Sequence, residues 1–266
     1  MKYLRVIWLL SVFMMLQMAT PASAAIAFDG VDDYVDCGNV TNLNSTATSI
    51  YTRFTVSTNT DFEYLFVQQN SANTGINGVL FWFPGTSGNG RIAFTGSNSL
   101  GANAVFRHSN DGTIAINTEY VAIATWDGGL TATNIHIYVN GTEVGYAVTT
   151  NGSGTPSAST GKSVIGARTF DTLRQLSGTV RELAVWNTVI SAQNIAILSN
   201  SRVRQMPLQI APANLIAYWA LDDSPDGTSG DGDTFRDGKV TFNGTGVDGA
   251  NNTGLTVNAE AQVSYP

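Results

Sequence analysis

The sequence predicts an all-β protein built as a sandwich or barrel of antiparallel sheets, and three observations support this. Glycine, asparagine, serine and threonine are abundant, while charged residues reach only 12% and aromatic residues 10%. This turn-rich composition is typical of all-β domains. Short apolar or alternating runs recur along the chain with turn formers between them, which indicates many short strands. Only one segment has a convincing helical period.

The chain begins with the features of a secretory signal peptide over residues 1–24. Lys2 and Arg5 give a positive start, Val6–Met18 is apolar, and Ala22-Ser23-Ala24 supplies small residues for cleavage. The apolar run is shorter than the roughly 20 residues that span a bilayer. We therefore expect a secreted, extracellular or cell-surface protein, with the periplasm as the alternative, and no stable membrane insertion.

The net charge of the chain limits the classes of molecule that it could bind. The whole chain carries −7, and removing Lys2 and Arg5 with the signal leaves −9. Such an acidic protein is a poor candidate for binding nucleic acid or anionic membranes.

A single cysteine, Cys37, excludes an intrachain disulfide, so the fold has to be held by core burial, with metal as a further aid. We expect Cys37 to be a buried small apolar residue.

Thirteen runs are candidate strands, separated by turn formers. They are Ala25–Phe28, Tyr34–Cys37, Phe54–Ser57, Tyr64–Gln68, Gly78–Phe83, Ile92–Thr95, Ala104–His108, Tyr120–Trp126, Ile135–Val139, Glu143–Val148, Ser163–Gly166, Gly178–Trp186 and Leu215–Ala220.

The clearest single element is a hairpin. Asn140-Gly141 follows the alternating run Ile135–Val139 and can take the positive φ values of a type I′ turn. Alternation places Ile135 and Ile137 on one face and His136 on the other. His136 is therefore expected to be an exposed strand residue.

The one predicted helix runs from Ser191 to about Asn200. Ser191 is suited to cap its N-terminus, and Ile195 and Leu198 fall on one side. The segment Thr149–Lys162, rich in glycine, serine and threonine, is expected to be an exposed loop or flexible connection.

Three segments in this order carry a family resemblance. Residues 27–38 (AFDGVDDYVDCG) resemble the first strands of laminin-G-like domains in the concanavalin A-like lectin/glucanase superfamily. Residues 137–145 (IYVNGTEVG) are similar to that family's YVDG hairpin, and residues 178–195 resemble its closing strand and short helix. The resemblance implies a pentraxin-like jelly roll of two antiparallel sheets with one short helix over residues 25–200. Lectins, pentraxins, carbohydrate-binding modules and some glycanases share this fold, so it permits a function without assigning one.

The C-terminal segment, residues 214–266, departs from the family's order. Its strand Leu215–Ala220 and Asp/Gly-rich loop resemble the opening of such a domain, yet they come last. The segment is either a permuted terminal strand of the main sandwich or a truncated second copy. About 50 residues can hardly bury an independent core, which favours packing on the main domain, with residues 201–213 as the linker.

The resemblance also implies calcium as the cofactor, because many relatives bind it near the ends of their sheets. Asp29, Asp32 and Asp33 lie in the family's strand-turn-strand motif, and Glu182 matches a position that is usually acidic. Arg181 replaces a second acid that is common there, which weakens this inference. The alternative is that the aspartates are turn residues that accept local backbone N–H bonds. For the loop Asp222–Asp237, a solvated acidic loop is favoured over a calcium site.

Sugar binding needs flat apolar rings to stack on pyranose rings and polar groups to hold hydroxyls. Alternation puts Trp82 on the face opposite Phe81 and Phe83, so one of these two sets belongs to the core. Trp126 and Trp186 are expected in the core. The candidate ligand-binding residues are Trp82, Tyr64, Asn77 and Arg91.

The function that these observations favour is a secreted, non-catalytic carbohydrate-binding or adhesion module, calcium-dependent if the aspartates hold the ion. Its partners would be glycans or surface proteins. The first alternative is a structural or assembly subunit of the cell surface or extracellular matrix. A glycan hydrolase or lyase is less favoured, because the chain lacks the Glu-x-Asp-x-x-Glu strand of the superfamily's glycanases and its five glutamates are scattered.

Overall fold

The computed structural model describes most of the chain after the predicted signal peptide. The described residues are 25–40, 43, 47–58, 62–69, 78–85, 90–96, 104–155, 159, 161–168, 174–200, 206–222, 231–239 and 241–247, together with the backbone of 256–257. The predicted signal peptide and the candidate ligand residue Asn77 lie outside them. Among the described residues, no helix is long and apolar enough to cross a membrane.

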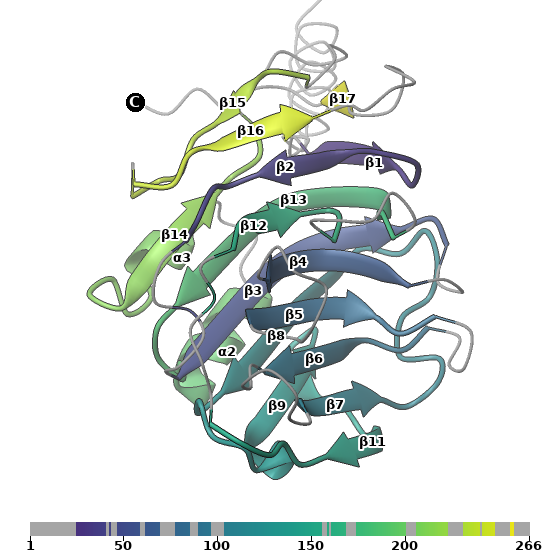
Figure 1. The fold of residues 1–266 in the computed structure, drawn as a ribbon, viewed down its shortest axis with the longest axis vertical. Helices are drawn as coiled ribbons and strands as arrows, with labels where there is room; N and C mark the ends of the chain where they lie inside the picture. The colour runs from purple at the N-terminus through teal and green to yellow at the C-terminus, as the bar shows by residue number, and fades with distance from the viewer. Residues whose placement is uncertain are drawn as a thin grey trace, which may run out of the picture.

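Two antiparallel sheets form the body of the protein (Figure 1). The first, sheet A, has the order β10-β9-β8-β3-β13-β1-β17, and β14 pairs with the second half of β13. Its strands are β1 (Ile26–Asp29), β3 (Thr48–Val56), β8 (Tyr120–Trp126), β9 (Ile135–Val139), β10 (Thr142–Glu143), β13 (Ser177–Trp186), β14 (Leu215–Trp219) and β17 (Thr256–Val257).

The second sheet, sheet B, has nine strands among the described residues, in the order β11-β7-β6-β5-β4-β12-β2-β16-β15. They are β2 (Tyr34–Asp36), β4 (Glu63–Gln69), β5 (Gly78–Phe83), β6 (Ala93–Gly96), β7 (Val105–Ser109), β11 (Tyr146–Thr150), β12 (Ser163–Ile165), β15 (Thr234–Phe235) and β16 (Gly244–Val247). The prediction of an all-β, two-sheet antiparallel sandwich is confirmed.

The core lies between the two sheets and is rich in aromatic rings. Phe54 of β3 lies 5.5 Å from Phe83 of β5 between ring centroids, and Trp126 of β8 lies 6.2 Å from Phe94 of β6. All four side chains are at most 1% exposed. Cys37 is buried as predicted, at 2% exposure. These contacts join the sheets without a disulfide.

The outer face of sheet A is covered by two short helices, α2 (Ala192–Asn200) and α3 (Met206–Gln209). The predicted helix is confirmed as α2, whose N-terminus is capped by Ser191 Oγ, 3.2 Å from Asn194 N. Trp186 is fully buried under this layer, and its Nε1 donates to the Ile210 carbonyl at 2.7 Å. The helix α3, which lies in the segment predicted as a linker, was not anticipated.

The predicted hairpin is present. Asn140 and Gly141 have φ values of 49° and 84°, the left-handed values that a type I′ turn requires. Val139 pairs with Thr142 across the turn. Ile135 and Ile137 are fully buried.

The C-terminal segment supplies strands to both sheets. β14 pairs with β13 in sheet A, while β16 pairs with β2 in sheet B (Figure 1). Asp237, 1% exposed, holds the intervening loop because its carboxylate accepts the backbone N–H groups of Tyr218, Lys239, Thr241 and Phe242 at 2.8 to 3.1 Å.

Candidate functional site

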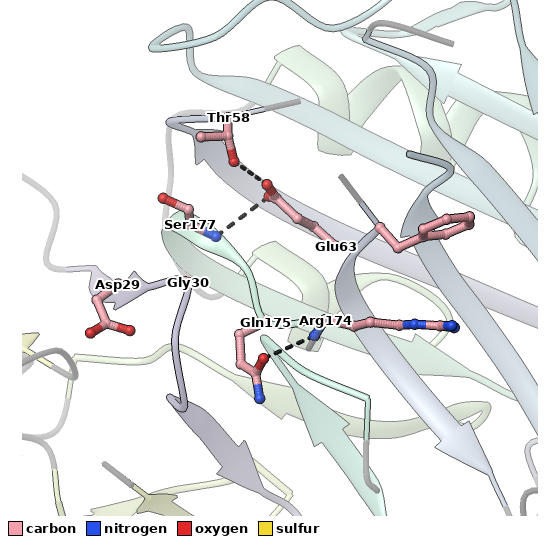
Figure 2. A pocket seen from close by; sticks show the side chains of 8 residues that line it. Asp29, Gly30, Thr58, Glu63, Arg174, Gln175 and Ser177 are labelled. Carbon is pink, nitrogen blue, oxygen red and sulfur yellow. Dashed lines mark hydrogen bonds between the residues drawn. The ribbon is translucent and has the colours of Figure 1, made fainter. Parts of the chain in front are cut away.

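A pocket of about 320 Å³ opens at one end of the sandwich, where β1 and β3 end and β4 and β13 begin (Figure 2). Four separate stretches of chain meet there because antiparallel pairing brings the ends of these strands together. The residues that line the pocket are Asp29, Gly30, Thr58, Phe62, Glu63, Arg174, Gln175 and Ser177.

The turn after β1 forms one wall. Gly30 has a φ of +83°, a left-handed value that glycine takes without strain. Asp29 Oδ1 accepts the Val31 N–H at 2.7 Å, and Asp33 Oδ2 accepts the Asp29 N–H at 2.7 Å. Asp29 also pairs with Ser177 of β13, so the turn is fixed against the sheet.

Glu63 is a carboxylate at the base of the pocket and is only 2% exposed. It accepts a short hydrogen bond from the Thr58 hydroxyl and a longer one, 3.4 Å, from the Ser177 N–H (Figure 2). Buried carboxylates require such donors. Glu63 therefore ties the end of β3 to the start of β13.

Arg174 connects the pocket to the outer face of sheet B. Its guanidinium carbon lies 5.1 Å from the centre of the Phe62 ring, within the range of a cation–π contact. Its Nη1 donates to the Tyr64 hydroxyl at 3.4 Å. Its backbone N–H donates to the Gln175 side chain at 2.9 Å.

An aromatic group adjoins the pocket and consists of Phe62, Tyr64 and Trp82. The Trp82 ring lies 5.7 Å from each of the other two between centroids, and the planes differ by only 10° and 11°. Trp82 Nε1 donates to Thr95 Oγ1 at 3.1 Å, which fixes the indole over β6. Phe62 is 37% exposed at the pocket rim. The group therefore offers a partly exposed apolar surface directly beside polar groups.

His108 of β7 extends this surface. Its ring meets Trp82 edge to face with 5.5 Å between centroids and lies 5.1 Å from the Phe106 ring. Burial, together with the nearby charge of Arg91, lowers the pKa of His108 to about 4. The imidazole is therefore neutral at physiological pH.

The structure brings together some of the predicted ligand residues. Tyr64 and Trp82 are in contact, and the Phe81 and Phe83 side chains lie in the core on the opposite face of the sheet, as alternation requires. Arg91 precedes β6, close enough to His108 to affect its pKa, and is paired with Asp111 at 2.8 Å.

Sequence reasoning missed Phe62, Glu63, Arg174 and Gln175 of the site. Phe62 lies two positions before Tyr64, directly before β4 begins, so the strand period of two could have identified it. Arg174 has no local signal, because it reaches Tyr64 across 110 positions in the chain.

The three candidate metal ligands from the β1–β2 turn also come together. Carboxylate oxygens of Asp29, Asp32 and Asp33 lie within 4.8 Å of one another, and Asp33 is fully buried. Calcium prefers six to eight oxygen ligands, so three converging carboxylates fit part of its shell.

The structure does not bring Glu182 to this cluster. Its carboxylate accepts the hydroxyl protons of Tyr51 and Tyr218 on the outer face of sheet A.

Comparisons with known proteins agree with this architecture. The model of the concanavalin A-like lectin/glucanases superfamily matches residues 29–196. No significant match was found among curated protein sequences. A candidate carbohydrate binding protein from Bacteroides ovatus is similar in structure, with a TM-score of 0.58 and 18% identity over 90% of this chain. The chain covers only 60% of the length of that protein.

A sialidase carbohydrate-binding module, CBM40 from Ruminococcus gnavus bound to α2,3-sialyllactose, is also similar. The TM-score between the two structures is 0.52, and their sequences are 10% identical. The match covers 66% of this chain and 96% of the module. At such low identity these likenesses establish the fold.

Proposed function

The chain belongs to the concanavalin A-like lectin/glucanases superfamily, and from this premise we propose that it is a non-catalytic carbohydrate-binding module. The single observation that carries the proposal is the junction of the polar pocket with the aromatic group at Phe62. A sugar has flat C–H faces and polar hydroxyls, so a binding site for it needs both surfaces side by side.

In this proposal the pocket holds hydroxyls while the aromatic group contacts the sugar ring. Arg174 supplies N–H donors, and Asp29 and Gln175 supply acceptors from two other stretches of chain. Phe62 is the ring with the greatest exposure in the aromatic group, and we assign the stacking contact to it. The Bacteroides and Ruminococcus proteins support the class of ligand by analogy of fold.

The burial and hydrogen bonds of Glu63 support a site that binds a glycan without hydrolysing it. A glycosidase needs two carboxyl groups that face the scissile bond, one as acid and one as base or nucleophile. Asp29 and Glu63 both line the pocket, but Glu63 is almost fully buried and accepts bonds from Thr58 and Ser177. We therefore assign Glu63 a structural role at the pocket base.

We further propose that calcium binds Asp29, Asp32 and Asp33. Asp29 both lines the pocket and belongs to this cluster, so an ion there would fix the pocket wall and offset its negative charge. The remaining ligands would be backbone carbonyls, ligand hydroxyls or water. We also propose that the protein is secreted, because residues 1–24 have the pattern of a signal peptide and glycans are abundant outside cells.

A glycan array probed with the folded chain, with calcium and with a chelator, tests the function. Phe62→Ala is expected to weaken binding to any glycan that scores by about tenfold, because an aromatic contact contributes roughly 0.5–1.5 kcal/mol beyond area burial. Val189→Ala, an exposed apolar change after β13, is the matched control. A blank array under both conditions, or equal binding by Phe62→Ala, would contradict the proposal. Release of shorter products from a bound glycan would instead indicate an enzyme.

A further inference from the structure

The aromatic group beside the pocket continues as a row of rings across sheet B. Strands β4, β5, β6 and β7 run side by side in that sheet (Figure 1). Their register aligns Tyr64 with Trp82, Trp82 with Ala93, and Ala93 with His108. These four residues therefore form one line across the strands, on the face of the sheet that points away from the core.

Ala93 is the small member of this line, and its size lets two larger rings meet above it. Neighbouring strands lie about 4.8 Å apart, so the strands that carry Trp82 and His108 are separated by roughly 10 Å. The centroids of the two rings are only 5.5 Å apart, in an edge-to-face contact. The two side chains therefore approach each other over β6 and make the row of rings continuous.

The row begins at the pocket and ends over β7. At the pocket, Phe62 lines the wall and stacks on Trp82 with 5.7 Å between centroids. Over β7, the Phe106 ring lies 5.1 Å from that of His108. Phe62 is 37% exposed, and Trp82, His108 and Phe106 are each partly exposed. A ligand can therefore reach the row, which is continuous with the candidate site.

We infer that the site binds its glycan as an extended chain of three or more sugar units, with one end unit in the pocket and the others along the row of rings. This inference rests on the proposed function and adds the length of the ligand to it. A pyranose ring is similar in size to one aromatic ring, so a monosaccharide at Phe62 would not reach His108. From β4 to β7 the line covers three strand spacings, about 14 Å. A chain of several units is needed to cover that distance.

The chemistry of the row suits the C–H faces of sugar rings. Burial and the nearby charge of Arg91 lower the pKa of His108, so its imidazole is neutral at physiological pH. Arg91 is itself paired with Asp111 at 2.8 Å. The indole N–H of Trp82 already donates to Thr95 Oγ1 at 3.1 Å. A sugar that covers these rings therefore desolvates no ion of the row, and such desolvation would cost free energy.

The dependence of binding on glycan length tests the inference with the full chain. The probes are linear oligosaccharides of glucose, galactose, mannose and xylose with one to six units, first immobilised on an array and then titrated as free sugars by calorimetry. For the series that binds, the affinity is expected to rise by about tenfold or more from the monosaccharide to the trisaccharide, because the added units contact further rings.

Variants at the two ends of the row should have different effects. His108→Ala is expected to weaken the binding of trisaccharides and longer chains by roughly twofold to tenfold and to leave the binding of the monosaccharide unchanged. Phe106→Ala tests the same end if His108→Ala does not fold. Phe62→Ala should weaken binding at every length. His136→Ala is the matched control, because it removes the other histidine, whose side chain is 41% exposed on sheet A.

Two results would overturn this inference and leave the proposed function standing. One is equal affinity for the monosaccharide and the hexasaccharide, which would confine the ligand to the pocket. The other is undiminished binding of long chains by both His108→Ala and Phe106→Ala, which would mean that the chain follows another path. An array that stays blank at every length would instead contradict the proposed function, and this inference with it.

Discussion

The hydroxyl of Tyr218, on β14, lies 2.9 Å from the carboxylate of Glu182, on β13. The same carboxylate accepts the Tyr51 hydroxyl at 2.6 Å and lies 3.6 Å from Arg53 Nε. Burial and the neighbouring Glu182 raise the pKa of Tyr51, so its hydroxyl remains a donor. This buried network connects the C-terminal segment to the centre of sheet A.

Tyr218→Phe is expected to lower the free energy of unfolding by roughly 1.5–3 kcal/mol, the usual contribution of a hydrogen bond to a charged group. Urea denaturation measures this difference. Tyr138→Phe, a hydroxyl deletion on the same sheet but outside the contacts of Glu182, is the control and should change stability by less than about 0.5 kcal/mol. Equal effects of the two changes would show that the network does not hold β14.

Stability should fall below neutral pH in part because of His108. Its pKa is lowered to about 4 in the folded state, against about 6.5 in the unfolded chain. The unfolded chain therefore binds the proton more tightly, and the native state loses stability as the pH falls from 6.5 to 4. The loss is at most about 3 kcal/mol, reduced by the solvent that reaches this half-buried ring.

His108→Gln should make the stability curve flatter across this window. The measurement is urea denaturation of both proteins at pH 7 and pH 5, and the difference between the proteins isolates His108 from the carboxylates. Identical slopes would mean that His108 titrates normally in the fold.

Calcium should stabilise the protein if it binds the aspartate cluster. At a free concentration one hundred times Kd, the gain is about 2.7 kcal/mol, which corresponds to a rise in Tm of roughly 5–10 °C for a chain of this size. Asp33→Asn should abolish the rise. Asp127→Asn changes another turn aspartate, which accepts the Gly129 N–H, and should keep it. A melting curve that is identical in calcium and in chelator would rule out this site.

Cys37 should be unreactive in the native protein. The side chain is 2% exposed, and burial raises the pKa of its thiol, so very little thiolate is available. A thiol reagent at pH 8 should label less than about a tenth of the protein in the time that labels it fully in 8 M urea. Rapid labelling without denaturant would indicate local opening between β2 and β12, where Cys37 N donates to the Ser163 carbonyl.

Much of the sandwich could be predicted because its signals are local. Alternation along β5 separated Trp82 from Phe81 and Phe83, and turn chemistry located Asn140-Gly141. The same logic explains why only part of the candidate site was found. The face of a strand on which a side chain lies follows from alternation within that strand. The residues that line a pocket depend instead on which strand ends the fold brings together.

The sequence by itself therefore determined the period of the strands, the hairpin turn and the capped helix, because each depends on residues within a few positions of one another. Only the tertiary structure decided that Arg174 reaches Tyr64 across 110 positions and that Glu63 meets Ser177 across 114. It also placed Glu182 with Tyr51 and Tyr218 and apart from the aspartates. Strand order and register set these contacts, and they depend on how both sheets share one core.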